Sequence, residues 1–433
     1  MPAALSSRAV AYSAPLLIAV FAAGVAAQDG DAAGARAAAW REDVQHVRQQ
    51  WAALHPDPWH ACAADAFDAA CAAFVAAVPG WTDDRCLVEL MRLVAQLGPE
   101  REGHAGVVAT DALTFLPVQL HEFADGVFVV DAATAHLDLV GARVLRLGDA
   151  AIDDVLAAVD PLVPRDCAMN ARVRRLPLAI APPVLHALGL APSRDRVVVR
   201  VQAQGATAPR DVTLVGAPFA ERLEWSVPGL LPDAPRPDRP RPRHLTGRAR
   251  AFRLETLADD GAVYVQYNRM DRQSERGETV RAFAERVLAA AAAPSARVIV
   301  DVRWNGGGDN TTYRPLLDAL ADAGCNRPGG LFVLMGRRTF SAAGNFVTEV
   351  ERRTEAILVG EETGGSPNQF GDARTVPLPR HPALAVRIPT RYHEKAPGDP
   401  RLTHAPDLPV AYTAADWLAG RDPVLQAALR HRP

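Results

Sequence analysis

From Phe252 onward, short apolar runs alternate with longer amphipathic stretches. The runs have the length of strands, and the stretches have the length and periodicity of helices. Regular alternation of this kind predicts βα units and a largely parallel sheet, because parallel strands need a crossover connection. The predicted strands are 263–267, 297–302, 331–335 and 356–360, and the predicted helices are 279–292, 312–323 and 342–353.

The residues before this alternation differ in character. Apolar side chains first recur at helical spacing, as in Trp40, Val44, Val47 and Trp51, and predict three helices. Strand-like runs follow, interrupted by an amphipathic stretch at 152–159, and then a Pro- and Arg-rich stretch predicts an extended linker or surface loop. The predicted organisation is a signal peptide at 1–27, a helical domain at 36–97, a small β-rich module at 113–215, a linker at 216–250 and an α/β core at 251–433.

The N-terminus has the pattern of an export signal. Arg8 is its only early charge, an apolar run extends from Ala14 to Val25, and small residues precede Gln28. The apolar run is about 12 residues, shorter than the roughly 20 that a membrane-spanning helix needs. We therefore expect a cleaved signal and a periplasmic or secreted protein with no stable membrane span; a short membrane anchor is the alternative.

Charge and cysteine content narrow the class of protein further. The chain has 47 basic and 50 acidic residues and a net charge of -3, without a run of like charges, so nucleic acid is not an expected partner. Its five cysteines permit a Cys62–Cys71 or Cys71–Cys86 disulfide after export, although inert buried thiols are the alternative for each. The full set is Cys62, Cys71, Cys86, Cys167 and Cys325.

Three consecutive glycines follow the predicted strand 297–302, at Gly306, Gly307 and Gly308. Glycine permits close backbone approach, so that main-chain N–H groups can point at a ligand oxygen. The segment is therefore a candidate oxyanion hole or phosphate cradle, with a flexible loop as the alternative. A P-loop is excluded, because no Gly-Lys-Ser/Thr follows.

Ser341 stands where the predicted strand 331–335 has ended and the helix 342–353 begins. A serine at a helix start is most often an N-cap. The same position suits a nucleophile, because the helix N-terminus stabilises negative charge and the N–H of Ala342 can help to bind an oxyanion. A serine nucleophile needs a base, and His104 is the histidine that lies in a sharp turn, after the third predicted helix.

These segments together resemble, in order along the chain, the clan of C-terminal processing (tail-specific) proteases and the tricorn core protease, to which retinoid-binding repeat modules are related. The resemblance rests on Gly103-His104, on Thr339-Phe340-Ser341-Ala342, and on three further segments. These are His55-Pro56-Asp57-Pro58-Trp59, Asp301-Val302-Arg303-Trp304-Asn305-Gly306-Gly307-Gly308 and Gly360-Glu361-Glu362-Thr363-Gly364-Gly365.

The departures from the family pattern indicate a branch. Processing proteases place a Lys base 25 residues after the Ser, where this chain has Ser366, so the resemblance favours the tricorn-like and retinoid-binding-repeat-like branch with His104 as base. Ala105 replaces a hydroxyl residue, and Gly344 replaces a Glu. The branch implies an acidic residue that orients the His; Asp399 is the nearest match, and the rivals are Glu394, Glu361 and Asp372.

The resemblance implies a crotonase-like βα core with a mainly parallel sheet, an N-terminal helical domain and a degenerate PDZ-like β-rich module. It implies a serine-type peptidase, an endopeptidase or a C-terminal processing peptidase, that acts on peptides or unfolded proteins without a metal or cofactor. Ser341, His104 and Asp399 would be catalytic, with Gly306, Gly307 and Ala342 as oxyanion donors. A non-catalytic ligand- or peptide-binding module and a small-ester or amide hydrolase are the alternatives.

Overall fold

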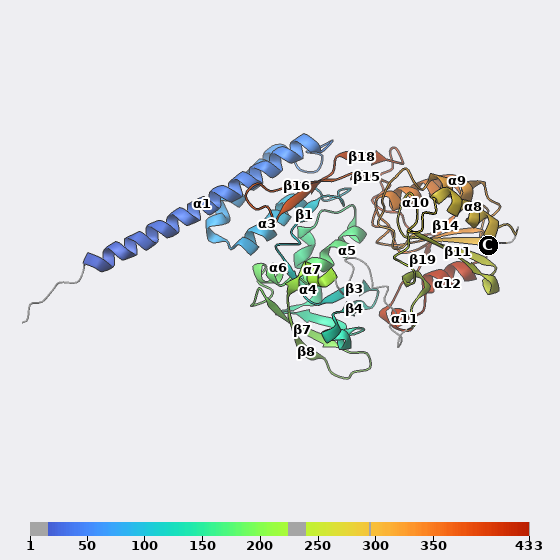
Figure 1. Ribbon diagram of the computed structural model, residues 1–433, viewed down its shortest axis with the longest axis horizontal. Helices are drawn as coiled ribbons and strands as arrows, with labels where there is room; N and C mark the ends of the chain where they lie inside the picture. The colour runs from blue at the N-terminus through green and yellow to red at the C-terminus, as the bar shows by residue number, and fades with distance from the viewer. Residues whose placement is uncertain (1–15, 224–239, 294–295, 433) are drawn as a thin grey trace, which may run out of the picture.

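The computed structural model describes residues 16–223, 240–293 and 296–432; side chains are described from residue 33 onward (Figure 1). The predicted signal peptide begins outside the described residues, and the first helix runs through its expected cleavage position. None of the helices in the described part combines the length and apolarity needed to cross a bilayer.

A six-stranded sheet forms the C-terminal half, in the order β10-β11-β12-β13-β14-β19. Only β10 is antiparallel to its neighbour; every other pair is parallel, as the alternating pattern predicted. The strands are β10 (Phe252–Leu257), β11 (Ala262–Tyr267), β12 (Arg297–Asp301), β13 (Leu331–Met335), β14 (Ile357–Gly360) and β19 (Leu408–Pro409).

Both faces of this sheet are covered, which explains why its strands read as continuous apolar runs. Val298 and Val300 of β12 face one helical layer, whereas Ile299 faces the other. The first layer is α8 (Val280–Ala290), α9 (Arg314–Asp322) and α10 (Ala342–Arg353), and the second contains α12 (Pro423–Arg430), which follows α11 (Ala414–Leu418).

The N-terminal half begins with three helices where the sequence predicts them. Trp40, Val44, Val47 and Trp51 are all buried, so the apolar stripe of the first helix faces the core. The helices are α1 (Leu16–Leu54), α2 (Ala64–Ala77) and α3 (Asp83–Ala95).

An antiparallel sheet follows, in the order β3-β4-β5-β7-β8, with β6 paired to β5. The amphipathic stretch predicted at 152–159 is the helix α4, and two further helices follow it. The strands are β3 (Val118–Phe123), β4 (Gly126–Ala132), β5 (Arg143–Leu147), β6 (Ala150–Ala151), β7 (Arg196–Gln202) and β8 (Arg210–Val215), and the helices are α4 (Ile152–Val159), α5 (Ala168–Ala179) and α6 (Pro182–Ala187).

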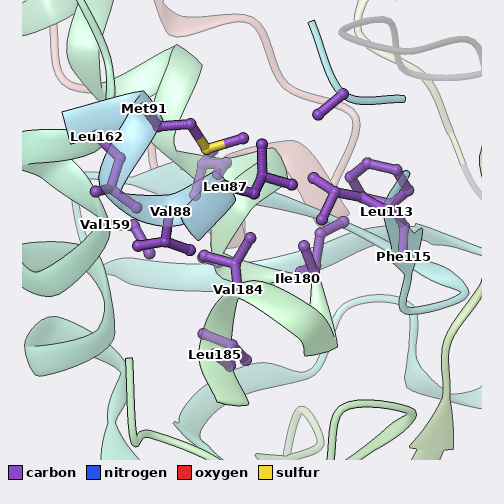
Figure 2. Packing of buried hydrophobic residues seen from close by; sticks show 14 of the residues in the cluster. Leu87, Val88, Met91, Leu113, Phe115, Val159, Leu162, Ile180, Val184 and Leu185 are labelled. Carbon is purple, nitrogen blue, oxygen red and sulfur yellow. The ribbon is translucent and has the colours of Figure 1, made fainter. Parts of the chain in front are cut away.

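The helical and β-rich parts share one hydrophobic core, so the sequence boundary between them does not separate two cores. The two parts share a core because the apolar face of α3 is buried against the β-rich part. Figure 2 shows side chains of α3, α4, α6 and the adjoining segments in contact, among them Leu87, Val88, Met91, Leu113, Phe115, Val159, Leu162, Ile180, Val184 and Leu185.

One segment of the predicted C-terminal core leaves that core and joins the N-terminal half. After β14 the chain forms a hairpin whose second strand pairs with the strand that follows α3. Leu378, Leu384, Val386 and Ile388 of this segment belong to the N-terminal hydrophobic core. The strands are β1 (Gly106–Val108), β16 (Arg374–Pro377) and β17 (Ala385–Ile388), flanked by the pair β15 (Asn368–Gly371) and β18 (Arg391–Glu394).

The predicted linker is packed at both ends, contrary to the expectation of an unpacked loop. At its start, β9 (Ala217–Pro218) pairs with β2 (Thr114–Phe115), and α7 (Phe219–Leu223) follows. At its end, His244 is buried and shares a hydrogen bond of 2.9 Å with Asp422. The intervening residues 224–239 lie outside the described part. The five cysteines are all free thiols, so neither predicted disulfide forms.

A buried ion-pair network fixes the strand end that carries the three glycines. Arg303 donates to both carboxylate oxygens of Asp422, at 2.8 and 2.9 Å, and to Asp301 at 2.5 Å. Arg303 and Asp422 are only 9% and 6% exposed. The network therefore ties the end of β12 to the start of α12.

Asp422→Ala is expected to lower the free energy of unfolding by about 3–5 kcal/mol, because it leaves a buried guanidinium with one carboxylate fewer. The adjacent Arg421→Ala removes only an exposed ion pair with Asp416 and should cost about 0.5 kcal/mol or less. Urea unfolding of the two variants measures the difference. Equal losses would show that the network contributes nothing beyond a surface pair.

Candidate active site

Ser341 lies in a backbone conformation that is rarely seen outside glycine. Its φ and ψ are 55° and -126°, in the turn between β13 and α10. Its hydroxyl does not cap the helix, although the residue occupies the N-cap position. Strain of this kind costs of order 1–3 kcal/mol and concentrates at functional sites, so the simple capping role is disfavoured.

His104 lies in the turn between α3 and β1, and the fold brings it to Ser341. Its Nε2 is 2.8 Å from the Ser341 Oγ, within hydrogen-bond distance. The imidazole also stacks on Phe340, with ring centroids 4.5 Å apart. The two residues that the sequence singled out as nucleophile and base therefore form a direct pair.

The imidazole of His104 is held neutral by its surroundings. Burial and, to a smaller extent, the positive charges of Arg387 and Arg174 lower its pKa to about 3, while the nearby Phe370 carbonyl opposes them. The Nδ1 atom makes no hydrogen bond of normal geometry to any residue in the described part. A neutral imidazole can accept the proton of Ser341, so the pair has the protonation state that a general base requires.

The depressed pKa of His104 predicts how stability changes with pH. In the unfolded chain a His has its ordinary pKa near 6.5. Between about pH 6.5 and 3 the unfolded state therefore binds a proton at this residue and the folded state does not. This contribution to stability is therefore present at pH 7 and is lost as the pH falls. Wild type should lose about 2 kcal/mol more than His104→Gln between pH 7 and 5, measured by urea unfolding at both pH values. Equal losses would contradict the depressed pKa.

The predicted third residue does not reach His104. The carboxylate of Asp399 binds Arg401 instead, at 2.8–3.1 Å, because the two residues stand two apart in one turn. Of its rivals, Glu361 pairs with Arg337, and Asp372 lies 3.3 Å from His393. No carboxylate in the described residues hydrogen-bonds to the imidazole, so the prediction of Asp399 as orienting residue is wrong for this geometry.

Two residues that the sequence did not single out hold the main chain around His104. Asp166 is fully buried and accepts hydrogen bonds from the N–H groups of Gly103, at 2.6 Å, and Ser366, at 3.3 Å. Burial raises the pKa of Asp166 to about 7, against those two hydrogen bonds. Arg174 donates to the carbonyl oxygens of Gly103 and Ala105, which flank His104 on either side. No local motif marks either residue, because both contacts are long-range in sequence.

The glycine segment lies beside Ser341, but only part of it offers free donors. The N–H of Gly307 donates to the side-chain oxygen of Asn305 at 2.9 Å, so it is occupied. The N–H groups of Gly306 and Ala342 have no hydrogen-bond acceptor in the described part of the chain. Of the three predicted oxyanion donors, the geometry therefore favours Gly306 and Ala342.

The same segment gives a matched pair of substitutions. A Cβ on Gly307 would lie 2.7 Å from the Ser341 Cβ and 2.9 Å from the Ala342 nitrogen, at a φ of +103°. A Cβ on Gly306 would meet nothing within 4 Å. Gly307→Ala should lower the free energy of unfolding by about 1–3 kcal/mol or more, and Gly306→Ala by about 0.5 kcal/mol or less. Urea unfolding compares them; a tolerated Gly307→Ala would contradict the close approach.

The positions that depart from the family pattern are accommodated. Gly344 lies inside α10, where a Cβ would meet the Gly365 Cα at 3.5 Å, so the helix packs closely on the following loop. Ser366 is fully buried, and its hydroxyl has no hydrogen-bond partner in the described structure. Ala105 is buried beneath the His104 turn.

One group of side chains within the described residues has the spacing of a metal site. The ligand atoms of His55, His60 and Glu102 lie within 4.8 Å of one another. However, His55 Nδ1 accepts the N–H of Asp57 at 3.1 Å, so the neutral ring carries its proton on Nε2, which is 2.7 Å from Glu102. That nitrogen is a donor and offers no lone pair to a metal. The group instead anchors the turn before His104 to the end of α1.

Comparisons with known proteins agree with this architecture. No protein-family model and no curated protein matches the sequence. The structure of mature CPAF complexed with lactacystin matches with a TM-score of 0.62 and 14% identity, over 91% of this chain and 98% of that chain. The crystal structure of mature CPAF matches with a TM-score of 0.60 and 14% identity, over 91% and 97%. The chain has the fold of CPAF.

A further similar structure is the photosystem II D1 C-terminal processing protease, with a TM-score of 0.41 and 14% identity over 89% of this chain and 98% of that chain. The similarity to CPAF extends over 91% of this chain, so the resemblance predicted from the sequence is confirmed at the level of the fold. The mixed α/β architecture with several sheets is also confirmed.

Proposed function

We propose that this protein is an exported serine-type peptidase, periplasmic or secreted, in which Ser341 is the nucleophile and His104 the general base. The observation that carries the proposal is the 2.8 Å contact between the Ser341 Oγ and the His104 Nε2, at a serine with strained backbone. The similarity to CPAF and to structures described as proteases supports a peptidase in general.

In the proposed reaction the Ser341 Oγ attacks the scissile carbonyl carbon while His104 Nε2 takes its proton. The tetrahedral oxyanion accepts hydrogen bonds from the N–H groups of Gly306 and Ala342. His104 then gives the proton to the leaving amine, the peptide bond breaks, and an acyl-enzyme remains on Ser341. Water, deprotonated by the same imidazole, hydrolyses the ester and restores the free serine.

A general base must be held in a fixed orientation. In this protein the restraint on the His104 imidazole comes from its own main chain. Arg174 and Asp166 hold the backbone on both sides of His104, and Phe340 packs on the ring. We therefore infer a Ser–His pair positioned by its backbone, in place of a triad closed by Asp399. These are positioning residues, since neither Arg174 nor Asp166 contacts the reacting atoms.

The finer parts of the proposal concern the substrate. We infer an endopeptidase or C-terminal processing peptidase that acts on peptides or unfolded proteins, because a cleft lined by Gly306, Gly307 and Phe340 adjoins Ser341 and can receive an extended chain. The sheet β3-β4-β5-β7-β8, as a degenerate PDZ-like module, would bind an extended segment by strand addition at an edge, and the C-terminal sheet would be the crotonase-like core. A non-catalytic binding module is disfavoured, because it gives no reason for the strained Ser341 to contact His104.

A substrate panel tests the assignment as a peptidase. An unstructured protein such as reduced, alkylated casein should be cleaved, with new termini detected by mass spectrometry, faster than small p-nitrophenyl esters are turned over relative to their uncatalysed hydrolysis. Turnover of esters alone would identify a small-ester hydrolase. Binding of casein without cleavage, and no reaction with a fluorophosphonate, would identify the non-catalytic alternative.

A further inference from the structure

A cleft of about 460 Å³ opens beside Ser341, and its lining has one sign of charge. Gly306, Gly307 and Phe340 contribute to its wall, so it adjoins the proposed oxyanion donors and the serine. None of the described residues that line it is an Asp or a Glu, whereas six are arginines: Arg174, Arg248, Arg269, Arg337, Arg338 and Arg387.

Some of these arginines already have ionic partners, and others do not. Arg337 binds Glu361, and Arg269 binds Asp271 and Glu275. Arg174, Arg338 and Arg387 form no ion pair with any residue of the described part. Arg174 donates hydrogen bonds to the carbonyls around His104. Arg338 and Arg387 therefore remain as the two cations that can bind an anionic ligand.

Aromatic packing holds one of these two cations in place. The Arg338 guanidinium lies 5.0 Å from the centre of the Trp304 ring, and Arg248 lies 4.3 Å from the same ring. Burial lowers the pKa of Arg338 to about 10, with Arg337 adding to the effect, and its Nε has no hydrogen-bond partner in the described structure. A half-buried guanidinium that packs on an aromatic ring is suited to a planar anion such as carboxylate.

We propose that this cleft is a carboxylate-binding subsite in which Arg338 and Arg387 select peptides with an acidic group next to the scissile bond. This inference rests on the proposed function and adds a substrate class to it. A cleft lined by charges of one sign attracts the opposite charge and concentrates it at the site. Carboxylates come from Asp and Glu side chains or from a free C-terminus; the cleft's place beside the serine suits either source.

The subsite would also act on the base. Arg387 and Arg174 lower the pKa of His104, which disfavours the imidazolium that forms during attack. A substrate carboxylate bound between these cations and the imidazole would offset their field and stabilise the imidazolium. Acidic substrates should therefore gain in kcat as well as in KM.

Matched peptides test the subsite. A fluorogenic peptide library with Glu or Gln at one position on either side of the cleaved bond, each amidated at its C-terminus, is compared with the same Gln peptides bearing a free C-terminus. The best Glu peptide or the free-acid peptide should exceed its neutral counterpart about 10-fold or more in kcat/KM, and the excess should shrink at 1 M NaCl. Preference for Glu in amidated peptides assigns a side-chain carboxylate; preference for the free acid assigns a C-terminal one.

The variants Arg338→Gln and Arg387→Gln should bring that ratio toward one. Arg196→Gln removes one positive charge from an exposed position on β7 and should leave the ratio unchanged. Equal cleavage of neutral and acidic peptides by wild type would overturn the subsite while leaving the peptidase proposal intact.

A binding experiment keeps the inference testable even where hydrolysis is not observed. Fluorescence anisotropy of labelled Glu, Gln and free-acid peptides with Ser341→Ala measures affinity without turnover. A carboxylate preference that Arg338→Gln abolishes supports the subsite, whatever the fate of the proposed peptidase activity. Equal affinities for all three peptides, together with equal rates of cleavage, would overturn the proposed carboxylate subsite.

Discussion

Replacing Ser341 with Ala is expected to abolish reaction with a fluorophosphonate probe and to lower peptide hydrolysis roughly 10⁴-fold or more. The reason is that the Ser341 hydroxyl is the atom within 2.8 Å of the His104 base, and alanine has nothing to attack the carbonyl with. Gel fluorescence after probe labelling and initial rates with a fluorogenic peptide measure the two effects. Labelling of Ser341→Ala at the wild-type rate would refute the assignment.

Ser366 provides the matched control for this experiment. It is a buried serine in the same region, its hydroxyl has no partner in the described structure, and it occupies the position of the Lys base in processing proteases. Ser366→Ala should retain labelling and should not be destabilised, because it removes a buried hydroxyl that makes no hydrogen bond. Loss of labelling in Ser366→Ala but not in Ser341→Ala would reverse the two roles.

His104→Gln is expected to lower kcat/KM roughly 10³- to 10⁴-fold or more, because glutamine cannot take the serine proton. The variant Ser341→Ala/His104→Gln should be no slower than the slower single variant, since residues that act as one unit are not additive. Steady-state kinetics of the three variants measure this. Losses that multiply would show that the two residues act independently.

An exposed histidine gives the corresponding control. His186→Gln on α6 makes the same substitution at an exposed position that is distant in sequence from Ser341 and His104. It should leave kcat/KM unchanged. Circular dichroism of each variant establishes that the fold is retained. A folded His104→Gln with wild-type kinetics would require another base.

The regular elements of both halves could be predicted from the sequence because their burial is uniform. Strand β12 is covered on both faces and therefore reads as an unbroken apolar run. The amphipathic stretch at 152–159 coincides with α4 because one face of that helix packs on the core. The hairpin of β16 and β17 was not predicted, since its return to the N-terminal core depends on pairing with β1, far away in sequence.

The candidate site could be predicted only where short segments carry it. Ser341 and His104 each lie at a junction between predicted elements. The resemblance to a family with the same order of segments predicted that the two residues act together. Asp399 was chosen as the nearest match to the acidic residue that the branch implies, and sequence spacing did not indicate that Arg401 would bind its carboxylate. Asp166 and Arg174 contact the His104 turn but lie far from it in sequence. No local sequence pattern therefore predicts their role.

The pairing of His104 with Ser341 joins residues 237 positions apart and carried by different hydrophobic cores. The core that carries His104 is itself completed by Leu378, Leu384, Val386 and Ile388, which follow Ser341 in the chain. A nascent chain that ends before Ile388 therefore lacks part of the packing that positions the imidazole. Catalytic power would arise only after both cores have formed, so that an incompletely folded chain remains latent toward its own exposed peptide bonds.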